Sequence, residues 1–307
     1  MKVPLYFPSC TSPFFTPSVR KSFLFKWIPR ASHHGQSPEI RKSEWKADRR
    51  CGWALDLDFL ADAVTDKTRV VVVNFPHNPT GFLPDSGFLL ELSRLSDDRG
   101  FVVFSDEVYR GLEYDRSDRL PSFTDINERA VSLSVMSKTY GLAGLRIGWI
   151  ATRNAELYGK LAAFKDYTSI CSSAPSEYLA ALALRHHEEI QERNLRIIRG
   201  NLERLDEFFS RHEDVFEWRR PKAGPVAFPR FLGESVEGFC DEVRREAGVL
   251  LLPGTLYGRE YSRVRIGFGR RNLPQTLKQL DGHLQARGPK RTAPGRNARA
   301  RSRRRCH

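Results

Sequence analysis

The sequence predicts an α/β fold in which a mainly parallel central sheet is flanked by helices, followed by a small C-terminal α+β domain. Short apolar runs, of which Val70-Val71-Val72-Val73 is the clearest, are typical of strands buried on both faces. Segments with helical spacing of apolar residues separate these runs, which favours a parallel sheet. A chain of 307 residues is long enough for one large and one smaller domain.

Helices and strands alternate from Trp53 onwards. The first expected helix has its apolar positions at Leu57, Leu60 and Val64, and Gly100 is expected to end the second. We expect helices at 55–64 and 84–99, and strands at 69–75, 101–105, 131–135 and 147–152. This order predicts the core of the large domain.

Helices dominate the middle of the chain, from Ala155 to about His212. The segment 188–211 carries one apolar stripe with charges between its members, and such a helix is long enough to bridge two domains. The small domain is expected to contain strands at 225–232, 249–252 and 264–268 and helices at 236–247 and 274–285. Ser235 and Gly248 are the expected start and stop signals of the first of these helices.

The two ends of the chain differ from this core in composition. Residues 1–50 carry +7 and residues 286–307 carry +9, so the total of +13 leaves −3 for the part between them. The first 38 residues lack Asp and Glu and are rich in Ser and Pro, loosely like a transit peptide. We therefore divide the chain into a disordered or unrelated segment 1–50, a large domain 51–187, a bridging helix 188–213, a small domain 214–285 and a basic disordered tail 286–307.

Composition also excludes several classes of function. The five cysteines are scattered and no HExxH is present, so neither a metal site nor a disulfide framework is expected, and a reducing, cytoplasmic setting is the default. An organellar location is the alternative, if residues 1–38 are a transit peptide. No run of 18 apolar residues predicts a membrane span. A basic tail such as the Arg-rich end binds phosphate polymers weakly and nonspecifically, so we expect no specific nucleic-acid recognition.

A Gly-rich turn carries one lysine, Lys138, where the strand 131–135 ends, and Arg146 follows eight residues later. An amine at a strand end beside an arginine suits a Schiff base to a phosphorylated aldehyde cofactor. The alternative is a solvated loop lysine and a surface arginine. This segment alone leaves both interpretations open.

Polar residues also follow the two preceding strands. Asn78, Asp106 and Tyr109 lie after the strands 69–75 and 101–105, at the sheet edge where open α/β sheets bind ligands. A carboxylate beside a pyridine nitrogen keeps that nitrogen protonated, while amide and phenol donors stabilise an anionic ring oxygen. Taken singly, these residues also fit a turn, a helix cap and a core aromatic. Their occurrence together in this order favours the cofactor interpretation.

Three stretches together resemble the class I/II aminotransferases, which are pyridoxal-phosphate enzymes of fold type I. They are Asn-Phe-Pro-His-Asn-Pro-Thr-Gly from Asn74, Ser-Asp-Glu-Val-Tyr from Ser105, and Ser-Lys-Thr-Tyr-Gly-Leu-Ala-Gly-Leu-Arg-Ile-Gly-Trp from Ser137. The resemblance covers about Trp53 to Gln285. It implies that the large domain 51–187 binds pyridoxal 5′-phosphate and that the chain transfers an amino group from an amino acid to a 2-oxo acid, as a homodimer in amino-acid metabolism.

The resemblance also assigns roles to single residues. It implies that Lys138 forms the Schiff base and acts catalytically, and that Arg265 binds the substrate α-carboxylate. It further implies a cis bond between Asn78 and Pro79. The remaining cofactor contacts that it implies are Asp106 at the ring nitrogen, Asn78 and Tyr109 at the ring oxygen, Val108 on a ring face, and Ser137 and Arg146 at the phosphate.

The chain departs from the family pattern before Trp53. Family members carry a further large-domain segment there, with a phosphate-binding loop and a stacking aromatic that residues 1–50 do not show. We therefore expect an incomplete large domain whose sheet lacks outer strands. Two alternatives to transamination follow: a non-catalytic or impaired fragment, or another pyridoxal-phosphate reaction, such as decarboxylation or elimination, on the same fold.

Overall fold

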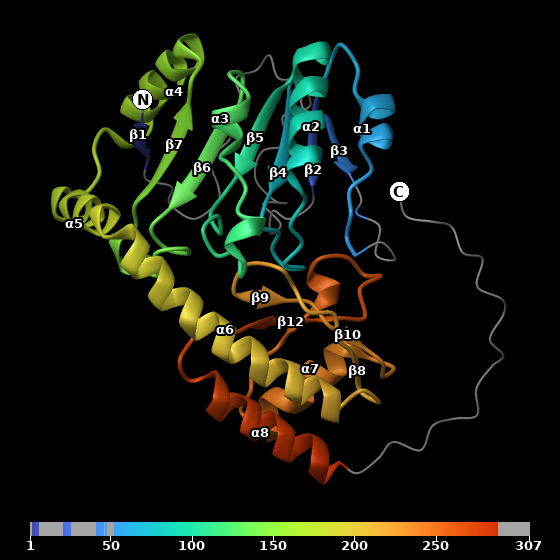
Figure 1. Cartoon of the computed structure of the whole chain (residues 1–307). Helices are drawn as coiled ribbons and strands as arrows, with labels where there is room; N and C mark the ends of the chain where they lie inside the picture. Colours follow the sequence, from blue (N-terminus) through green and yellow to red (C-terminus); the bar gives the residue numbers. More distant parts are fainter. Residues whose placement is uncertain (1, 6–20, 26–40, 46, 48–51, 288–307) are drawn as a thin grey trace.

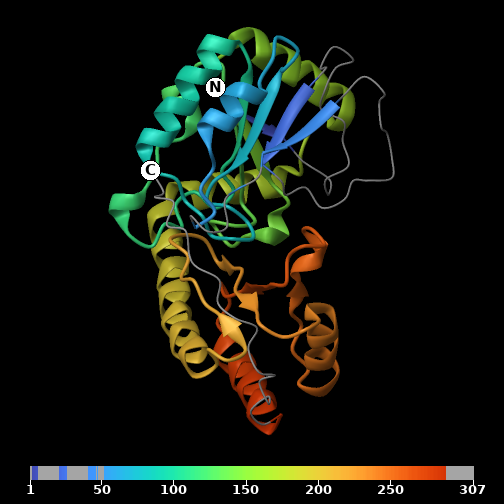
Figure 2. The same cartoon turned by 90° about the vertical axis from the view of Figure 1, so that its right-hand side faces the viewer.

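The computed structural model describes residues 2–5, 21–25, 41–45, 47 and 52–287. A sheet with helices on both faces forms the large domain, and a smaller group of helices and short strands forms the small domain (Figures 1 and 2). The long helix α6 (His187–Arg211) runs from the sheet to the group of short strands (Figure 1).

Seven strands in the order β1-β7-β6-β5-β4-β2-β3 make up the large sheet. The pairs from β3 through β6 are parallel, whereas β7 is antiparallel to both of its neighbours. The strands are β1 (Lys2–Leu5), β2 (Lys21–Phe25), β3 (Arg41–Trp45), β4 (Val70–Asn74), β5 (Val102–Asp106), β6 (Val131–Val135) and β7 (Gly148–Thr152). The predicted fold class, with a mainly parallel central sheet, is confirmed.

Both faces of the sheet are covered because alternate residues of each strand point to opposite sides. On β5, Val103 packs in a core with α1 (Leu57–Ala63) and α2 (Ser86–Arg99), whereas Phe104 packs towards α4 (Ala155–Ser169). Asp85 caps α2 by accepting a hydrogen bond from the Phe88 amide at 2.8 Å, and Gly100 ends it at φ 73°. The apolar side chains on the two faces of the sheet are thus each covered by a layer of helices.

The small domain has its own core, built on one stripe of α6. Leu195, Ile198, Leu202, Leu205 and Phe209 of that stripe are buried against α7 (Val236–Glu246) and α8 (Leu273–Ala286). Its short strands are β8 (Phe216–Glu217), β9 (Val226–Ala227), β10 (Arg230–Phe231), β11 (Leu252–Pro253) and β12 (Val264–Gly267). The helix α5 (Ala174–Arg185) precedes α6 and packs beside the end of β6 and the start of β7. None of the described helices combines the length and apolar character needed to cross a bilayer.

The structure differs from expectation mainly near the start of the chain. Segments of residues 1–50, expected to be disordered or unrelated, form β1, β2 and β3, so the described sheet does not lack outer strands on either side of β4–β7. These strands are only four or five residues long and lie among Ser and Pro, which hid their pattern. The short helix α3 (Phe123–Ile126) and strand β8 also carried too little periodicity to be expected. Residues 288–307, most of the predicted basic tail, lie outside the described residues.

Candidate active site

The carboxyl ends of β4, β5 and β6 lie at one edge of the sheet because these strands are parallel. Asn74, the last residue of β4, pairs in register with Asp106, the last residue of β5. The loop after β4 lies against the small domain, where Gly81 approaches Pro221 and Ala223. The bonds Phe75–Pro76 and Asn78–Pro79 in this loop are both cis, and the second was expected. The edge predicted to bind a ligand therefore lies at the junction of the two domains.

Asp106 is a half-buried residue at this edge, and its carboxyl group is poorly solvated. Its burial raises its pKa from 3.8 to about 6, and the negative charge of Glu107 acts in the same direction. A hydrogen bond from the Val108 amide to Asp106 Oδ1 (3.2 Å) and the positive charge of Lys138 oppose this rise. The carboxylate is thus a poorly solvated anion that a neighbouring cation would stabilise.

Asn78 and Tyr109 are joined across the domain junction by one arginine. Arg265, from β12 of the small domain, donates from Nε to Asn78 Oδ1 at 3.0 Å and is hydrogen-bonded to Tyr109. Asn78 is 6% exposed and Tyr109 is 3% exposed. Burial raises the pKa of the Tyr109 phenol, while the charge of Arg265 opposes that rise. The predicted residues at the ring oxygen and the predicted carboxylate-binding arginine therefore form one connected group.

Lys138 lies in the turn after β6 and belongs to the same neighbourhood. Its Nζ is 6.0 Å from the centroid of the Tyr109 ring, and its charge lowers the pKa of Asp106. The lysine side chain is exposed, whereas the next residue, Thr139, is buried. The structure thus brings Lys138, Asp106, Tyr109, Asn78 and Arg265 together.

Thr139 fixes the backbone that carries Lys138. Its amide donates to the Val108 carbonyl at 3.3 Å, and its hydroxyl lies 2.9 Å from the carbonyl oxygens of both Val108 and Arg110. Its own carbonyl accepts from Asn194 Nδ2 of α6 at 2.9 Å. Thr139 was not predicted from the sequence, although its place beside the lysine was a usable signal. Through Val108, this residue ties the lysine turn to the segment of Asp106 and Tyr109.

The two residues predicted to bind a phosphate occupy more open positions. Arg146 is exposed, with φ 52°, and its guanidinium donates to the Ala143 carbonyl of its own turn at 3.3 Å. Ser137 is half-buried immediately before Lys138. Neither shares a hydrogen bond with the Asn78–Tyr109–Arg265 group among the described residues, so the structure does not join them to the rest of the predicted site.

An open groove begins beside the lysine turn. Val108 and Thr139 line one part of it, and it continues along Ser134 of β6 and Trp149 of β7, with a volume of about 610 Å³. Cofactor-sized molecules occupy pockets of about 300–1,000 Å³ in other proteins. Val108 is the one predicted site residue that lines this groove, so the groove lies beside the group formed by Lys138, Asp106 and Tyr109 rather than between its members.

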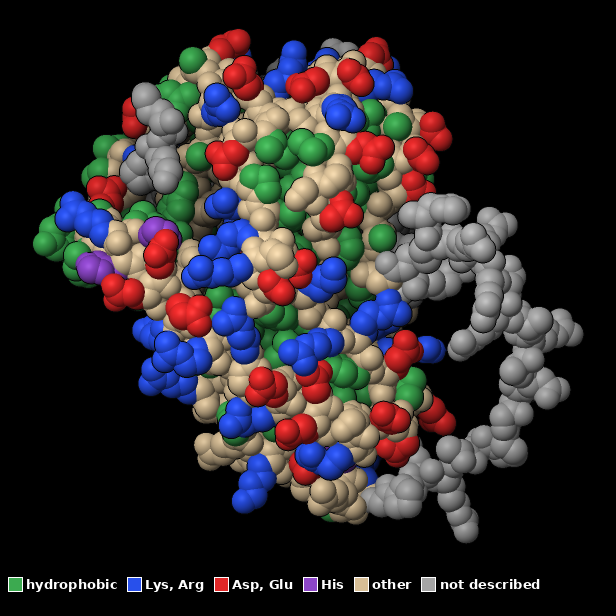
Figure 3. All heavy atoms as spheres, in the orientation of Figure 1, with side chains coloured by type: hydrophobic (Ala, Val, Ile, Leu, Met, Phe, Trp, Pro, Cys, Tyr) green, Lys and Arg blue, Asp and Glu red, His purple; other side chains and the backbone are tan. Residues whose placement is uncertain are grey.

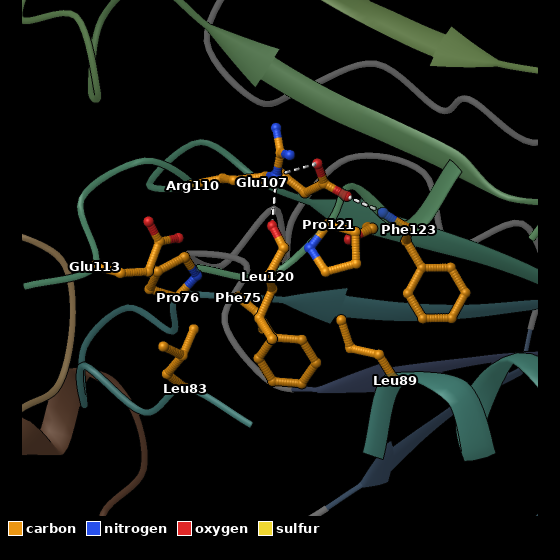
Figure 4. Close-up of a pocket in the computed structure, with 11 residues that line it drawn as sticks. Phe75, Pro76, Leu83, Leu89, Glu107, Arg110, Glu113, Leu120, Pro121 and Phe123 are labelled. Atoms are coloured by element: carbon orange, nitrogen blue, oxygen red, sulfur yellow. Dashed lines mark hydrogen bonds and ion pairs between the residues drawn. The ribbon is translucent and has the colours of Figure 1, made fainter. Parts of the chain in front are cut away.

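A second, much smaller cavity is lined by residues of the segment 105–123 and holds only about 10 Å³, room for about one water molecule (Figure 4). Glu107 accepts there from the Phe123 amide at 2.8 Å, and Arg110 donates to the Leu120 carbonyl at 3.1 Å. Burial raises the pKa of Glu107 and also that of Glu113 on the same wall. This cavity is too small for a substrate, and its polar groups anchor the loop that follows Asp106.

Charge is mixed on the face of the molecule drawn in Figure 3. Acidic and basic side chains are interspersed over both domains there, without one sign covering the whole face. This distribution agrees with the small net charge of residues 51–285. It contrasts with the basic ends of the sequence.

Comparisons with known proteins place these features in a family. The model of the family "Aminotransferase class I and II" matches residues 32–279, beginning before Trp53, where the resemblance in sequence was expected to start. Capreomycidine synthase of Streptomyces vinaceus is 34% identical over 250 residues, covering 79% of this chain and 64% of the synthase. The chain spans between 34% and 64% of the length of the curated relatives compared.

Two solved structures share the fold. A PLP-dependent aminotransferase from Streptococcus suis superposes with a TM-score of 0.79 and 30% identity, covering 87% of this chain and 70% of that one. The PLP-dependent cyclase OrfR has a TM-score of 0.75 and 29% identity, covering 89% and 74%. With the family match over most of its length, the chain belongs to the class I and II aminotransferase family.

Proposed function

We propose that this protein is a pyridoxal-phosphate-dependent aminotransferase that moves an amino group from an amino acid to a 2-oxo acid. The observation that carries the proposal is the meeting of Lys138 with Asp106 and Tyr109 at the sheet edge, because these residues come from separate loops. The aminotransferase from S. suis supports it by its fold and its stated cofactor. The activity and substrates of the whole protein are part of this proposal, since the chain spans only part of its relatives.

The donor set fits pyridoxal phosphate. When bound, this cofactor supplies a protonated pyridine ring that withdraws electrons from the substrate. Asp106 would lie at the ring nitrogen, where an anion of raised pKa gains most from a cationic neighbour. Asn78 and Tyr109 would donate to the ring oxygen, and Val108 would pack on one ring face. Ser137 and Arg146 would bind the phosphate, because a guanidinium offers several donors in a fixed fork.

Lys138 and Arg265 would act on the substrate. Lys138 would hold the cofactor aldehyde through its amine and, once displaced, accept the proton from the substrate Cα and return it as a general base. Arg265 would bind the α-carboxylate, which orients the Cα–H bond towards the lysine. Its bond to Asn78 already fixes the guanidinium at the domain junction. Substrate binding would thus engage both domains, and we propose a homodimer as the working form.

A second candidate is another pyridoxal-phosphate reaction on the same site. Capreomycidine synthase and the cyclase OrfR favour it, because neither is named as an aminotransferase although both are about as similar to this chain as the S. suis enzyme is. The group formed by Asp106, Lys138 and Tyr109 serves either reaction. Only the fate of the amino group distinguishes them.

The test is to label the lysine and then to follow the amino group. Protein incubated with pyridoxal phosphate and reduced with borohydride should carry the cofactor on Lys138, as located by peptide mass spectrometry. The Lys138→Ala variant should carry none, whereas Lys160→Ala, which changes an exposed lysine paired with Glu156, should be labelled like the wild type. Labelling elsewhere, or no labelling, would contradict the proposal.

In a separate sample, unreduced protein loaded with pyridoxal phosphate should transfer ¹⁵N from a panel of amino acids to 2-oxo acids. Transfer that stops in Lys138→Ala supports transamination, with an expected loss of about 10²–10⁴-fold or more for a missing general base. Consumption of an amino acid without ¹⁵N transfer supports the second candidate instead. Cofactor labelling without turnover of any substrate supports the impaired-fragment alternative.

A further inference from the structure

Asn74 lies at the end of β4, and its side-chain amide makes two hydrogen bonds that the proposed chemistry does not use. Its Nδ2 donates to the Asp106 carbonyl at 2.9 Å, and its Oδ1 accepts from the Asn78 amide at 3.0 Å. One amide group therefore contacts the backbone of two residues that are 28 positions apart in the chain.

We propose that Asn74 is a positioning residue that sets the spacing between Asp106 and Asn78, and so between the partners of the cofactor's ring nitrogen and ring oxygen. This inference rests on the proposed function. Asn78 is held at two points: its backbone by Asn74 and its side chain by Arg265 at 3.0 Å. Without Asn74, the backbone N–H of Asn78 would lose this acceptor, and the hydrogen bond from Arg265 would be left to orient the Asn78 side chain.

The chemistry of the position calls for an amide. At this point the strand ladder ends, because the Asp106 carbonyl already accepts from the Phe75 amide at 3.2 Å and the chain then enters the cis bond before Pro76. A carboxamide offers one donor and one acceptor and so continues the ladder in place of a peptide group. Asp at this position would keep the acceptor and lose the donor, whereas Ala would lose both.

The chain provides a matched control for a purely structural role. Asn127 is also an asparagine whose amide joins two backbone segments of the large domain. Its Nδ2 lies 3.0 Å from Ser93 Oγ, and its Oδ1 accepts from the Arg129 amide at 2.9 Å. Asn127 touches none of the proposed cofactor residues, so Asn127→Ala measures the cost of losing such an amide away from the site.

The first experiment uses the full chain without cofactor. Hydrogen exchange of the segment 75–80 should accelerate about tenfold at the Asn78 amide in Asn74→Ala, because its acceptor is removed. The rate should stay near the wild-type value in Asn74→Asp, which keeps that acceptor, and in Asn127→Ala. Unchanged exchange in Asn74→Ala would overturn the inference, whether or not the protein binds pyridoxal phosphate.

The second experiment uses protein loaded with pyridoxal phosphate. The dissociation constant of the cofactor should rise about tenfold in both Asn74→Ala and Asn74→Asp, and the pH midpoint of its visible absorbance should rise by about half a unit as Asn78 loses its alignment to the ring oxygen. Asn127→Ala should change neither quantity. Equal effects of Asn74→Ala and Asn127→Ala would reduce Asn74 to a structural role. Wild-type protein that binds no cofactor would contradict the proposed function but leave the exchange result standing.

Discussion

The candidate site has two halves that differ in how they are held. The first, which we call the buried half, consists of Asn78, Asp106, Tyr109 and Arg265, whose side chains are half-buried or buried and joined to one another or to the backbone. The exposed half consists of Ser137, Lys138 and Arg146, where Thr139 fixes the backbone but the two charged side chains face solvent. The contacts that would recognise the ring are thus built into the fold, whereas those that would bind the phosphate depend on the ligand itself.

Burial of the first half has a thermodynamic cost, since polar groups taken from water destabilise the fold unless they are paired. Exposure of the second half has almost none, because solvated charges contribute little to stability. Mutations in the two halves should therefore affect different quantities. Changes in the buried half should alter the free energy of unfolding, whereas changes in the exposed half should alter cofactor binding alone.

The largest effect is expected at Asp106. Since its folded pKa is raised from 3.8 to about 6, the folded state binds more protons than the unfolded state in this window, and the stability of the cofactor-free protein falls as pH rises from about 4 to 6. Asp106→Asn removes this loss and should stabilise the cofactor-free protein at pH 8 by up to about 3 kcal/mol. The same change should lower cofactor-dependent activity by at least about a hundredfold.

Urea unfolding of the cofactor-free protein at pH 4 and pH 8 measures the effect. The exposed Asp214→Asn is the charge-matched control and should leave the pH dependence of the wild type unchanged. If Asp106→Asn loses as much stability between pH 4 and pH 8 as the wild type does, Asp106 is not the destabilising carboxyl that the structure indicates.

Arg265 should show the next largest effect, with the opposite sign. Arg265→Leu removes the donor to Asn78 Oδ1 and the contact with Tyr109, which leaves two buried polar groups without that partner. We expect a loss of about 1–3 kcal/mol in the free energy of unfolding. Thermal and urea unfolding measure it, with the exposed Arg271→Leu as a control that should stay within about 0.5 kcal/mol of the wild type. A loss no larger than that of the control would show that the two domains are not joined through this residue.

Much of this arrangement was predictable from the sequence. The strands β4 to β7 follow from β-branched runs and glycine stops, and the residues at their ends follow from the rule that parallel strands end at one edge. The cis bond before Pro79 also agrees with the resemblance to the family. The bounds of α2, β6 and α7 differ from expectation by no more than two residues.

Other parts of the site could not be predicted because they depend on contacts between distant segments. The hydrogen bond between Arg265 and Asn78 joins residues 187 positions apart, and no local sequence pattern predicts a contact between such distant residues. Asn74 and Thr139 have ordinary polar side chains, and only the hydrogen bonds they make in the fold distinguish them. The antiparallel β7 follows β6 after the connection 136–147, and its apolar run was compatible with either direction.

The smallest effect on stability, and the sharpest test of the comparison, is expected at Arg146. Arg146→Ala removes one exposed side chain and one local bond to Ala143, so the free energy of unfolding should change by less than about 0.5 kcal/mol. If its guanidinium binds the phosphate, the affinity for pyridoxal phosphate should fall about tenfold to a hundredfold, whereas that for pyridoxal, which lacks the phosphate, should stay the same. Arg153→Ala, at an exposed arginine that pairs with Glu128 at 3.8 Å, is the control and should affect neither ligand. Equal losses for both ligands would place Arg146 at the ring rather than at the phosphate, and the division of the site into two halves would then be wrong at this residue.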